Sequence, residues 1–342
     1  MANEKQVFMK LLRIFVVTMI LATVASACRT SKPYRRCEGV VWGTTFHITY
    51  SSNAVLDDSI RAIMREVDES LSAYNESSLV SRINRCETDV TDSMFRNVFM
   101  ESLRINKISG GRFDPTIAPL SKLWGFDTKE AVKRQPSRER LDSVMHMVGI
   151  ADCRLAGEGR VVKKDSLTTF NFSAIAKGYG CDLIGQMLSR NGVTDYMVEI
   201  GGEIVVRGKN SRGSDWRIMI DAPVNSADSI VHDGMAVIEI DSCAVATSGN
   251  YRNYKILDGE VVGHTMNPFT GLPAKSDILS VTILAPECIT ADAIATACMI
   301  MPLDSARIMV EGLDGVSAMF VTANDNGEWK LVPTTGFPEI TH

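Results

Sequence analysis

Apolar residues recur every three or four positions in several long stretches of the chain, which is the spacing of one face of an α-helix. One stretch, residues 60–71, follows candidate capping residues at 57–59, and another, residues 93–108, stops before the glycine pair at 110–111. The predicted helices are residues 60–71, 93–108, 174–190 and 291–301. Thr290 is the candidate cap of the last of these helices.

Elsewhere the apolar residues alternate with polar ones or form short blocks, as they do in β-strands. Two dipeptides, Gly201-Gly202 and Asn326-Gly327, interrupt such segments and predict tight turns. The predicted strands lie in residues 40–50, 196–208, 279–285, 316–322 and 329–332. Hairpins mixed with helices favour an α+β fold, with mixed or antiparallel sheets and packed helices, over a regular parallel α/β fold.

The N-terminus has the features of an export signal that is removed from the mature protein. Basic residues open it, and its apolar run over residues 14–27 is shorter than the roughly 20 residues that span a bilayer. Small residues precede Cys28, which favours a lipoprotein with lipid on Cys28 over simple secretion after Ala27. We therefore expect a signal peptide at 1–27, a tether at 28–39 and a folded domain at 40–342. We expect the mature protein to lie outside the cytoplasm, on the periplasmic side, anchored to a membrane.

Composition narrows the class of protein further. The 342 residues carry a formal net charge of −5, and 45% are hydrophobic, as in a globular protein with a sizeable core. A disordered chain, a fibrous protein and a disulfide-dense scaffold are excluded, and the mild acidity gives no sign of a nucleic-acid surface. An odd number of cysteines follows Cys28 without a C-x-x-C pair, so we expect most of them to be small buried residues.

Four loops carry residues that packing alone does not demand. They are residues 109–126, 173–182, 247–250 and 264–271. In the first, glycines, prolines and an Asp beside aromatic residues suit a rigid holder of a flat ligand, or a structural turn with a buried Trp. In the second, Lys177 stands among small residues at a predicted helix start, where backbone amides attract phosphate. The third exposes hydroxyls and amides, but each loop by itself also fits an ordinary structural role.

Asp292 and Thr296 are four residues apart and therefore share one face of an otherwise apolar helix. A carboxylate and a hydroxyl on a buried face fit a hard cation such as Mg²⁺, which takes oxygen ligands. The same two residues fit a structural role, in which Asp292 caps the helix and Thr296 bonds its own backbone. The spacing leaves both interpretations open.

In their order along the chain, these segments resemble one known family. The resemblance runs from about residue 40 to residue 301 and is strongest in residues 111–116, 174–179, 247–249 and 291–296. Shorter matches lie at Gly43, Tyr74, Gly201-Gly202, His264, Asn267-Pro268 and Gly271. On these residues the chain resembles the FAD:protein FMN transferases, the ApbE-like proteins. The resemblance implies an ApbE-like architecture related to the T-fold, and the family's lipoprotein signal agrees with the N-terminus.

Members of this family use Mg²⁺ and FAD to attach FMN, through a phosphoester, to a threonine or serine of an acceptor flavoprotein, and they release AMP. The resemblance implies these FAD contacts: Trp42, Tyr74, Arg112, Phe113, Asp114, Asn171, Lys177 and Met266. It implies these Mg²⁺ ligands: Ala174 through its carbonyl, Asp292 and Thr296. It also places His264 beside the reacting phosphate. Trp42 stands where a Met is usual, and Asn171 stands where an Asp is common.

The chemistry agrees with these expectations, because phosphoryl transfer depends on positioning and charge neutralisation. His264 is suited to accept the proton of the target hydroxyl near neutral pH, and Arg112 and Lys177 can offset the charge of FAD. The implied acceptor is a flavoprotein such as a subunit of an Nqr- or Rnf-type redox complex, with no nucleic-acid partner. Two alternatives are a periplasmic FAD pyrophosphatase and a flavin-binding lipoprotein without catalysis.

Overall fold

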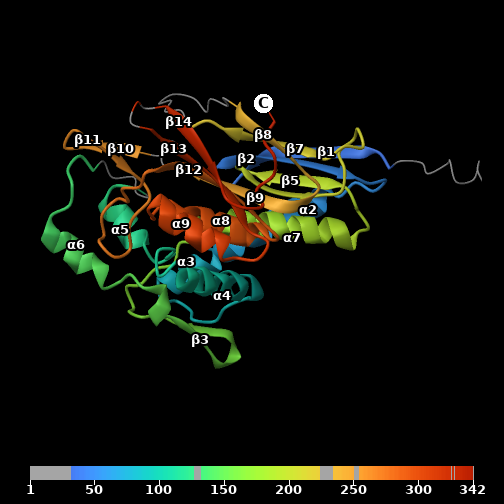
Figure 1. Ribbon diagram of the computed structural model, residues 1–342. Helices are drawn as coiled ribbons and strands as arrows, with labels where there is room; N and C mark the ends of the chain where they lie inside the picture. The colour runs from blue at the N-terminus through green and yellow to red at the C-terminus, as the bar shows by residue number, and fades with distance from the viewer. Residues whose placement is uncertain are drawn as a thin grey trace, which may run out of the picture.

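The computed structural model describes residues 32–126, 132–223, 234–249, 254–324, 326 and 328–341. In these residues eight strands form one sheet, and each neighbouring pair is antiparallel (Figure 1). In spatial order the strands are β1 (Tyr34–Val41), β2 (Thr44–Ser51), β5 (Tyr196–Ile200), β6 (Glu203–Arg207), β9 (Ser242–Gly249), β12 (Ile278–Ala285), β13 (Ser317–Ala323) and β14 (Trp329–Pro333). The predicted α+β fold is confirmed.

The helices lie on one side of this sheet (Figure 1). They are α2 (Asp57–Leu71), α3 (Leu79–Asn84), α4 (Ser93–Ile108), α5 (Ala118–Leu123), α6 (Arg138–Met145), α7 (Ala176–Arg190), α8 (Cys288–Cys298) and α9 (Leu303–Glu311). Of these, α5 and α6 pack against each other at one end of the molecule, away from the face of the sheet. The α7 helix packs against β5 and β6, and α8 packs against β9 and β12. The α2 and α4 helices contact α7 and α8, respectively, so α7 and α8 form the inner layer.

The central position of α8 follows from its sequence. The helix is apolar on all sides, and every residue in it except Thr296 is buried. A helix of this kind must be enclosed, and α8 is enclosed by the sheet, α7 and α4. It begins at Cys288 rather than at residue 291, so Thr290 lies inside the helix and does not cap it.

A hairpin of β7 (Trp216–Asp221) and β8 (Gly234–Ile240) covers the opposite face of the sheet. Its apolar side chains pack against Val206, Val245 and Leu284 of the sheet, in a cluster separate from the core under the helices. Smaller elements lie outside these layers. They are β3 (Arg154–Ala156), β4 (Arg160–Val162), β10 (Tyr254–Leu257), β11 (Glu260–Gly263) and the 3₁₀ turns η1 (Ile150–Asp152) and η2 (Gly157–Gly159).

Most of the elements predicted from periodicity are present. The helices predicted at 60–71, 93–108 and 174–190 correspond to α2, α4 and α7, although Leu56 and not residues 57–59 precedes α2 as its N-cap. The strands predicted around Gly201-Gly202 are β5 and β6. The hairpin predicted at Asn326-Gly327 joins β13 to β14, but Gly327 lies outside the described residues.

The start of the domain differs from the prediction. Tyr34–Val41 pair along their length with β2, and Trp42 and Gly43 form the turn between the two strands. Residues 34–39 of the predicted tether therefore belong to the folded domain, and the single strand predicted at 40–50 comprises the end of β1, the turn and most of β2. The reason is that β1 is an edge strand in which Cys37 alone is buried, so its composition resembles that of a linker.

The predicted signal peptide and Cys28 lie outside the described residues. In the part of the chain that is described, no helix is long and apolar enough to cross a membrane. The remaining cysteines are all unpaired. Most of them are buried, as predicted, whereas Cys86 is exposed and Cys243 is half-buried.

Candidate active site

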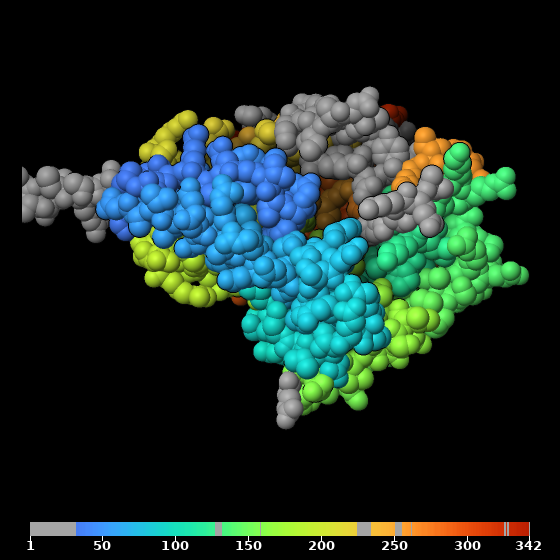
Figure 2. All heavy atoms as spheres, turned by 180° about the vertical axis from the view of Figure 1, so that it is seen from behind, coloured from blue at the N-terminus to red at the C-terminus, as the bar shows by residue number. Residues whose placement is uncertain are grey.

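The four loops singled out in the sequence meet around one cavity of about 410 Å³. Residues 112–126, the start of α7, the end of β9, residues 264–265 and α8 all line it. Figure 2 shows the surface hollowed between the blue and cyan N-terminal part of the chain and its green and orange parts. A second cavity of about 680 Å³, lined by Trp42 and the end of α2, adjoins it. Both cavities are lined by Tyr74, Ser173 and Lys177.

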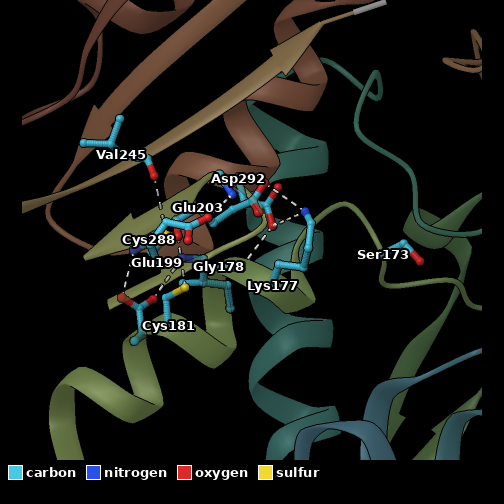
Figure 3. Close-up of polar contacts among 12 residues, drawn as sticks. Ser173, Lys177, Gly178, Cys181, Glu199, Glu203, Val245, Cys288 and Asp292 are labelled. Atoms are coloured by element: carbon cyan, nitrogen blue, oxygen red, sulfur yellow. Dashed lines mark hydrogen bonds and ion pairs between the residues drawn. The ribbon is translucent and has the colours of Figure 1, made fainter. Parts of the chain in front are cut away.

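Three charged side chains meet on the wall of the first cavity (Figure 3). The Lys177 Nζ lies 2.8 Å from Oε1 of Glu203 and 3.9 Å from Oδ2 of Asp292. The two carboxylates come from β6 and α8, and the lysine comes from the first turn of α7. When all three are ionised, this buried cluster carries one excess negative charge, which favours the binding of a cation.

Burial and mutual attraction shift the pKa values of these three groups in opposite directions. Burial raises the pKa of Glu203 and of Asp292 above their ordinary values, because it penalises a charged carboxylate, and the Lys177 ammonium opposes this rise. Burial alone would lower the pKa of Lys177, but the carboxylates of Asp292 and Glu203 outweigh it and raise that pKa. The two carboxylates therefore favour the charged form of Lys177, whereas burial disfavours the charged forms of the carboxylates themselves.

Asp292 does not cap its own helix, so the interpretation of this residue as the cap of α8 is wrong. The helix begins four residues earlier, and its first amides, those of Cys288 and Ile289, donate at 2.9 and 2.8 Å to the carboxylate of Asp182 on α7. Asp292 instead accepts a hydrogen bond of 3.1 Å from the amide of Gly178. Its carboxylate thus points at the first turn of α7 and into the cavity.

Gly178 allows this contact because α7 and α8 approach each other closely there. A Cβ atom on Gly178 would lie 2.3 Å from the carbonyl oxygen of Cys288 and 2.9 Å from the Cβ of Asp292. Neither partner is the free end of a flexible side chain. The small residue in the predicted phosphate-binding segment is therefore required for packing between the helices.

Residues 109–118 form a rigid wall of the cavity. Asp114 is buried, and its two oxygens accept hydrogen bonds from Thr116 and from the amide of Ile150. Burial raises the pKa of Asp114, and these hydrogen bonds oppose the rise. Arg112 lines the cavity and donates to the carbonyl of Ser109 at 3.1 Å. Asp114 thus orders the loop, while Arg112 supplies a positive charge at the wall.

The other predicted FAD contacts of this cavity lie around its entrance and at the start of α7. Tyr74 is 66% exposed and lines both cavities, which leaves its ring accessible to a ligand. Asn171 lines the first cavity, and its side-chain oxygen accepts from the amide and the hydroxyl of Ser173. Phe113 and Ala174 also line this cavity, and Phe113 is almost fully buried.

Trp42 and Met266 are not among the residues that line the first cavity. Trp42 has a positive φ of 49°, and its indole nitrogen donates to the carbonyl of Met64 at 3.2 Å, so the ring lies on α2 and lines the second cavity. Met266 is fully buried in a cluster with Leu120 and Trp124. The roles of Trp42 and Met266 as FAD contacts stay predictions. In this structure Met266 packs in the apolar cluster that includes Phe126, a residue of the cavity wall.

His264 lines the cavity, and its ring lies 6.4 Å from that of Phe126, centroid to centroid. Its loop is held by hydrogen bonds, including one of 2.8 Å from the Trp124 indole to the carbonyl of Gly271. The end of β9 adds Thr247, whose hydroxyl lies 2.9 Å from that of Thr282. Thr296 lines the cavity one helical turn after Asp292.

Glu203 is the residue that the sequence interpretation missed. The Gly201-Gly202 turn was recognised, but the acid after it was not considered. The available signal was an acid at the first position of β6, directly before three apolar residues, where its side chain is buried. Among the described residues, no group of three or more His, Cys, Asp or Glu side chains is placed to hold a metal ion. The predicted metal ligands include a single carboxylate and are not such a group.

Comparison with known proteins shows the family of this chain. The family model described as the ApbE family matches residues 42–320. The chain belongs to the ApbE family. Its relatives include the FAD:protein FMN transferase of Haemophilus influenzae, 31% identical, with 91% of this chain and 93% of the relative covered. The corresponding enzyme of Vibrio cholerae is 32% identical, with 92% and 96% covered.

Solved structures of the ApbE family agree with the fold. The flavin transferase ApbE from Vibrio cholerae superposes with a TM-score of 0.79 at 31% identity, covering 89% of this chain and 98% of that one. The apo form of the Pseudomonas stutzeri flavinyl transferase ApbE gives a TM-score of 0.79 at 30% identity, covering 90% and 97%. The chain is thus an FAD:protein FMN transferase, an enzyme that flavinylates acceptor proteins with FAD as its substrate.

Proposed function

We propose that this transferase moves FMN from FAD to a threonine or serine hydroxyl of its acceptor in a Mg²⁺-dependent reaction that releases AMP. The observation that carries the proposal is the position of Lys177. It stands in the first turn of α7, beside two buried carboxylates, and it lines both adjoining cavities. An elongated ligand that extends through both cavities would therefore pass Lys177 at their junction.

FAD has this form, because a pyrophosphate joins its two ring systems. The Lys177 ammonium and the amides at the start of α7 favour a phosphate group at the junction. The exposed ring of Tyr74 can stack on a flat ring system, and Arg112 adds positive charge at the wall. These features support a bound FAD with its pyrophosphate beside Lys177.

The donor set at the same point suits Mg²⁺. Asp292, Thr296 and the carbonyl of Ala174 all line the cavity and offer oxygen atoms, which hard cations prefer. Oε2 of Glu203 is buried without a hydrogen-bond partner among the described residues, so the cluster keeps an unsatisfied acceptor. Bound Mg²⁺ would neutralise part of the pyrophosphate charge, and Asp292, Thr296 and Ala174 would hold it there.

The chemical step forms one bond and breaks another at the same phosphorus. The acceptor's hydroxyl oxygen attacks the phosphorus of the FMN half of FAD, and the bond from that phosphorus to the AMP oxygen breaks. His264 is the imidazole on the cavity wall, and it accepts the hydroxyl proton. Lys177 offsets the negative charge that develops on the departing AMP.

The test is incubation of the full chain with FAD, Mg²⁺ and a candidate acceptor, the flavin-bearing subunit of an Nqr-type reductase. We expect the intact mass of the acceptor to rise by one FMN less one water, with one AMP released per acceptor. AMP formation without a mass change would identify an FAD pyrophosphatase instead. Binding of FAD with no AMP under any condition would identify a flavin carrier.

We further propose that the mature protein is a lipoprotein on the periplasmic side of a membrane, attached through Cys28. The small residues before Cys28 and the short apolar run at 14–27 support this assignment. The described domain begins its first strand at Tyr34, so only a short segment separates Cys28 from the sheet. The active site would then lie close to the membrane, where a membrane-associated acceptor can reach it.

A further inference from the structure

Lys177 does not lie midway between its two acidic neighbours. Its Nζ is 2.8 Å from Oε1 of Glu203 and 3.9 Å from Oδ2 of Asp292. The first distance is that of a direct hydrogen-bonded ion pair, and the second is too long for a hydrogen bond. Glu203 therefore holds the ammonium, while Asp292 accepts a hydrogen bond from the Gly178 amide.

The backbone fixes Glu203 in this position. The residue opens β6 directly after a two-glycine turn, and its carbonyl accepts a hydrogen bond of 3.3 Å from the thiol of Cys181 on α7. The amide of Gly202 donates to the side chain of Glu199 at 2.8 Å, which orders the turn itself. The Glu203 side chain is 4% exposed, and its Oε2 has no hydrogen-bond partner among the described residues. A carboxylate buried in this way is costly for folding, which favours a role in function over one in packing.

We propose that Glu203 is a positioning residue, which holds the Lys177 ammonium away from Asp292 and so keeps the Asp292 carboxylate open to a divalent cation. The inference rests on the proposed Mg²⁺ site. An ammonium and a Mg²⁺ ion compete for one carboxylate, because both are cations and the carboxylate is buried. With Glu203 as its partner, Lys177 stays beside the pyrophosphate without occupying the oxygens of Asp292.

Three variants separate this role from its alternatives. In Glu203→Gln, Lys177 is free to pair directly with Asp292, so we expect the affinity for Mg²⁺ to fall. The expected loss is about 10- to 100-fold, which is typical when a residue that orients a metal ligand is changed. Glu203→Asp keeps the charge but shortens the reach, so we expect weaker Mg²⁺ binding here too. In the double variant Lys177→Met with Glu203→Gln, the competing cation is gone, so we expect the Mg²⁺ affinity to recover.

The measurement is the rise in melting temperature of the full chain as Mg²⁺ is added, with and without FAD, and with no turnover required. Melting in EDTA checks that each variant folds. Glu101→Gln is the matched control, because Glu101 is another shielded carboxylate, which pairs with Arg104 at 2.5 Å and contacts α8 through Thr290. We expect this control to respond to Mg²⁺ as the wild type does.

The outcomes distinguish the possible explanations. A wild type that Mg²⁺ does not stabilise, even with FAD, would remove the metal site and the inference with it. If the wild type responds and Glu203→Gln responds equally, the inference fails and the metal site stands. If Glu203→Asp binds Mg²⁺ like the wild type, then Mg²⁺ affinity depends on the net charge of the cluster and not on the position of the residue-203 carboxylate. If the double variant stays weak, Glu203 is itself a ligand. Either of these last two results overturns the positioning role.

Discussion

At the scale of single residues, we propose that His264 accepts the proton that the acceptor's hydroxyl loses as it attacks phosphorus. Its imidazole is on the wall of the same cavity as Lys177 and lies beside Phe126. Loss of this group should slow the chemistry while the cavity that binds FAD stays intact.

We therefore expect His264→Ala to lower the flavinylation rate by about 10²- to 10⁴-fold. FAD affinity should stay close to that of the wild type. Single-turnover rates at saturating FAD, with a fluorescence titration of FAD binding, measure the two effects separately. A variant with a near-normal rate would show that His264 merely orders its loop.

Asp292 is the second residue whose role a single change can test. Asp292→Asn keeps the shape of the side chain and can still accept from the Gly178 amide, but it loses the formal charge. Mg²⁺ binds mainly through one or two carboxylates and substrate phosphates, so we expect a folded variant with little activity that recovers partly at raised Mg²⁺. Thr296→Val, which loses a neutral oxygen, should show a milder defect. A wild-type rate and Mg²⁺ dependence in Asp292→Asn would refute the metal assignment.

At the scale of elements, the close approach of α7 and α8 brings Lys177 and Asp292 together. Gly178 is the contact point, and the added methyl of Gly178→Ala would overlap the backbone of Cys288. We expect this change to destabilise the fold by about 1–3 kcal/mol and to reduce activity by displacing α7 from α8.

Gly157→Ala is the matched control, because a Cβ there meets nothing within 4 Å and the residue does not have a positive φ. It should leave stability and activity nearly unchanged. Thermal unfolding of both variants, with the flavinylation rate, measures the difference. Equal melting temperatures for the two variants would show that the helices can separate at no cost.

At the scale of the whole molecule, the site joins parts of the chain that are far apart in sequence. Its cavity is lined by residues from Tyr74 to Ile300, and the antiparallel sheet with its two inner helices holds them in place. Among the described residues, by contrast, none before Trp42 lines either of the two cavities. Anchoring and catalysis should therefore be separable.

We expect Cys28→Ser to release the protein from membranes while transferase activity in extracts is retained. The reason is that a lipid on Cys28 would be the attachment, whereas the folded domain begins at β1. Fractionation of cells into membrane and soluble parts, with an activity assay on each, tests this expectation. A Cys28→Ser protein that still sediments with membranes would argue against lipidation.

Periodicity and turn chemistry determined much of the fold without any tertiary information. The α4 helix shows strong spacing of apolar residues and a clear stop at its glycine pair, and the β5–β6 hairpin shows its two-glycine turn. The segments that line the cavity could be named in advance, because a lysine and side chains with oxygen atoms stand in them among small residues and turns. Such local signals depend on residues close together in the chain.

Contacts between distant residues could be decided only by the tertiary structure. Nothing local in β1 distinguishes an edge strand from a linker, since its partner β2 supplies the hydrogen bonds. Spacing could not show whether Asp292 caps α8, and the tertiary structure excluded this, because Asp182 caps α8 from another helix. Only the tertiary structure places the buried Glu203 beside Lys177, and this contact makes Glu203 a candidate residue of the site. The physical reason is that the energy of a buried charge depends on its neighbours in space. Those neighbours come from distant parts of the chain, so the local sequence does not specify them.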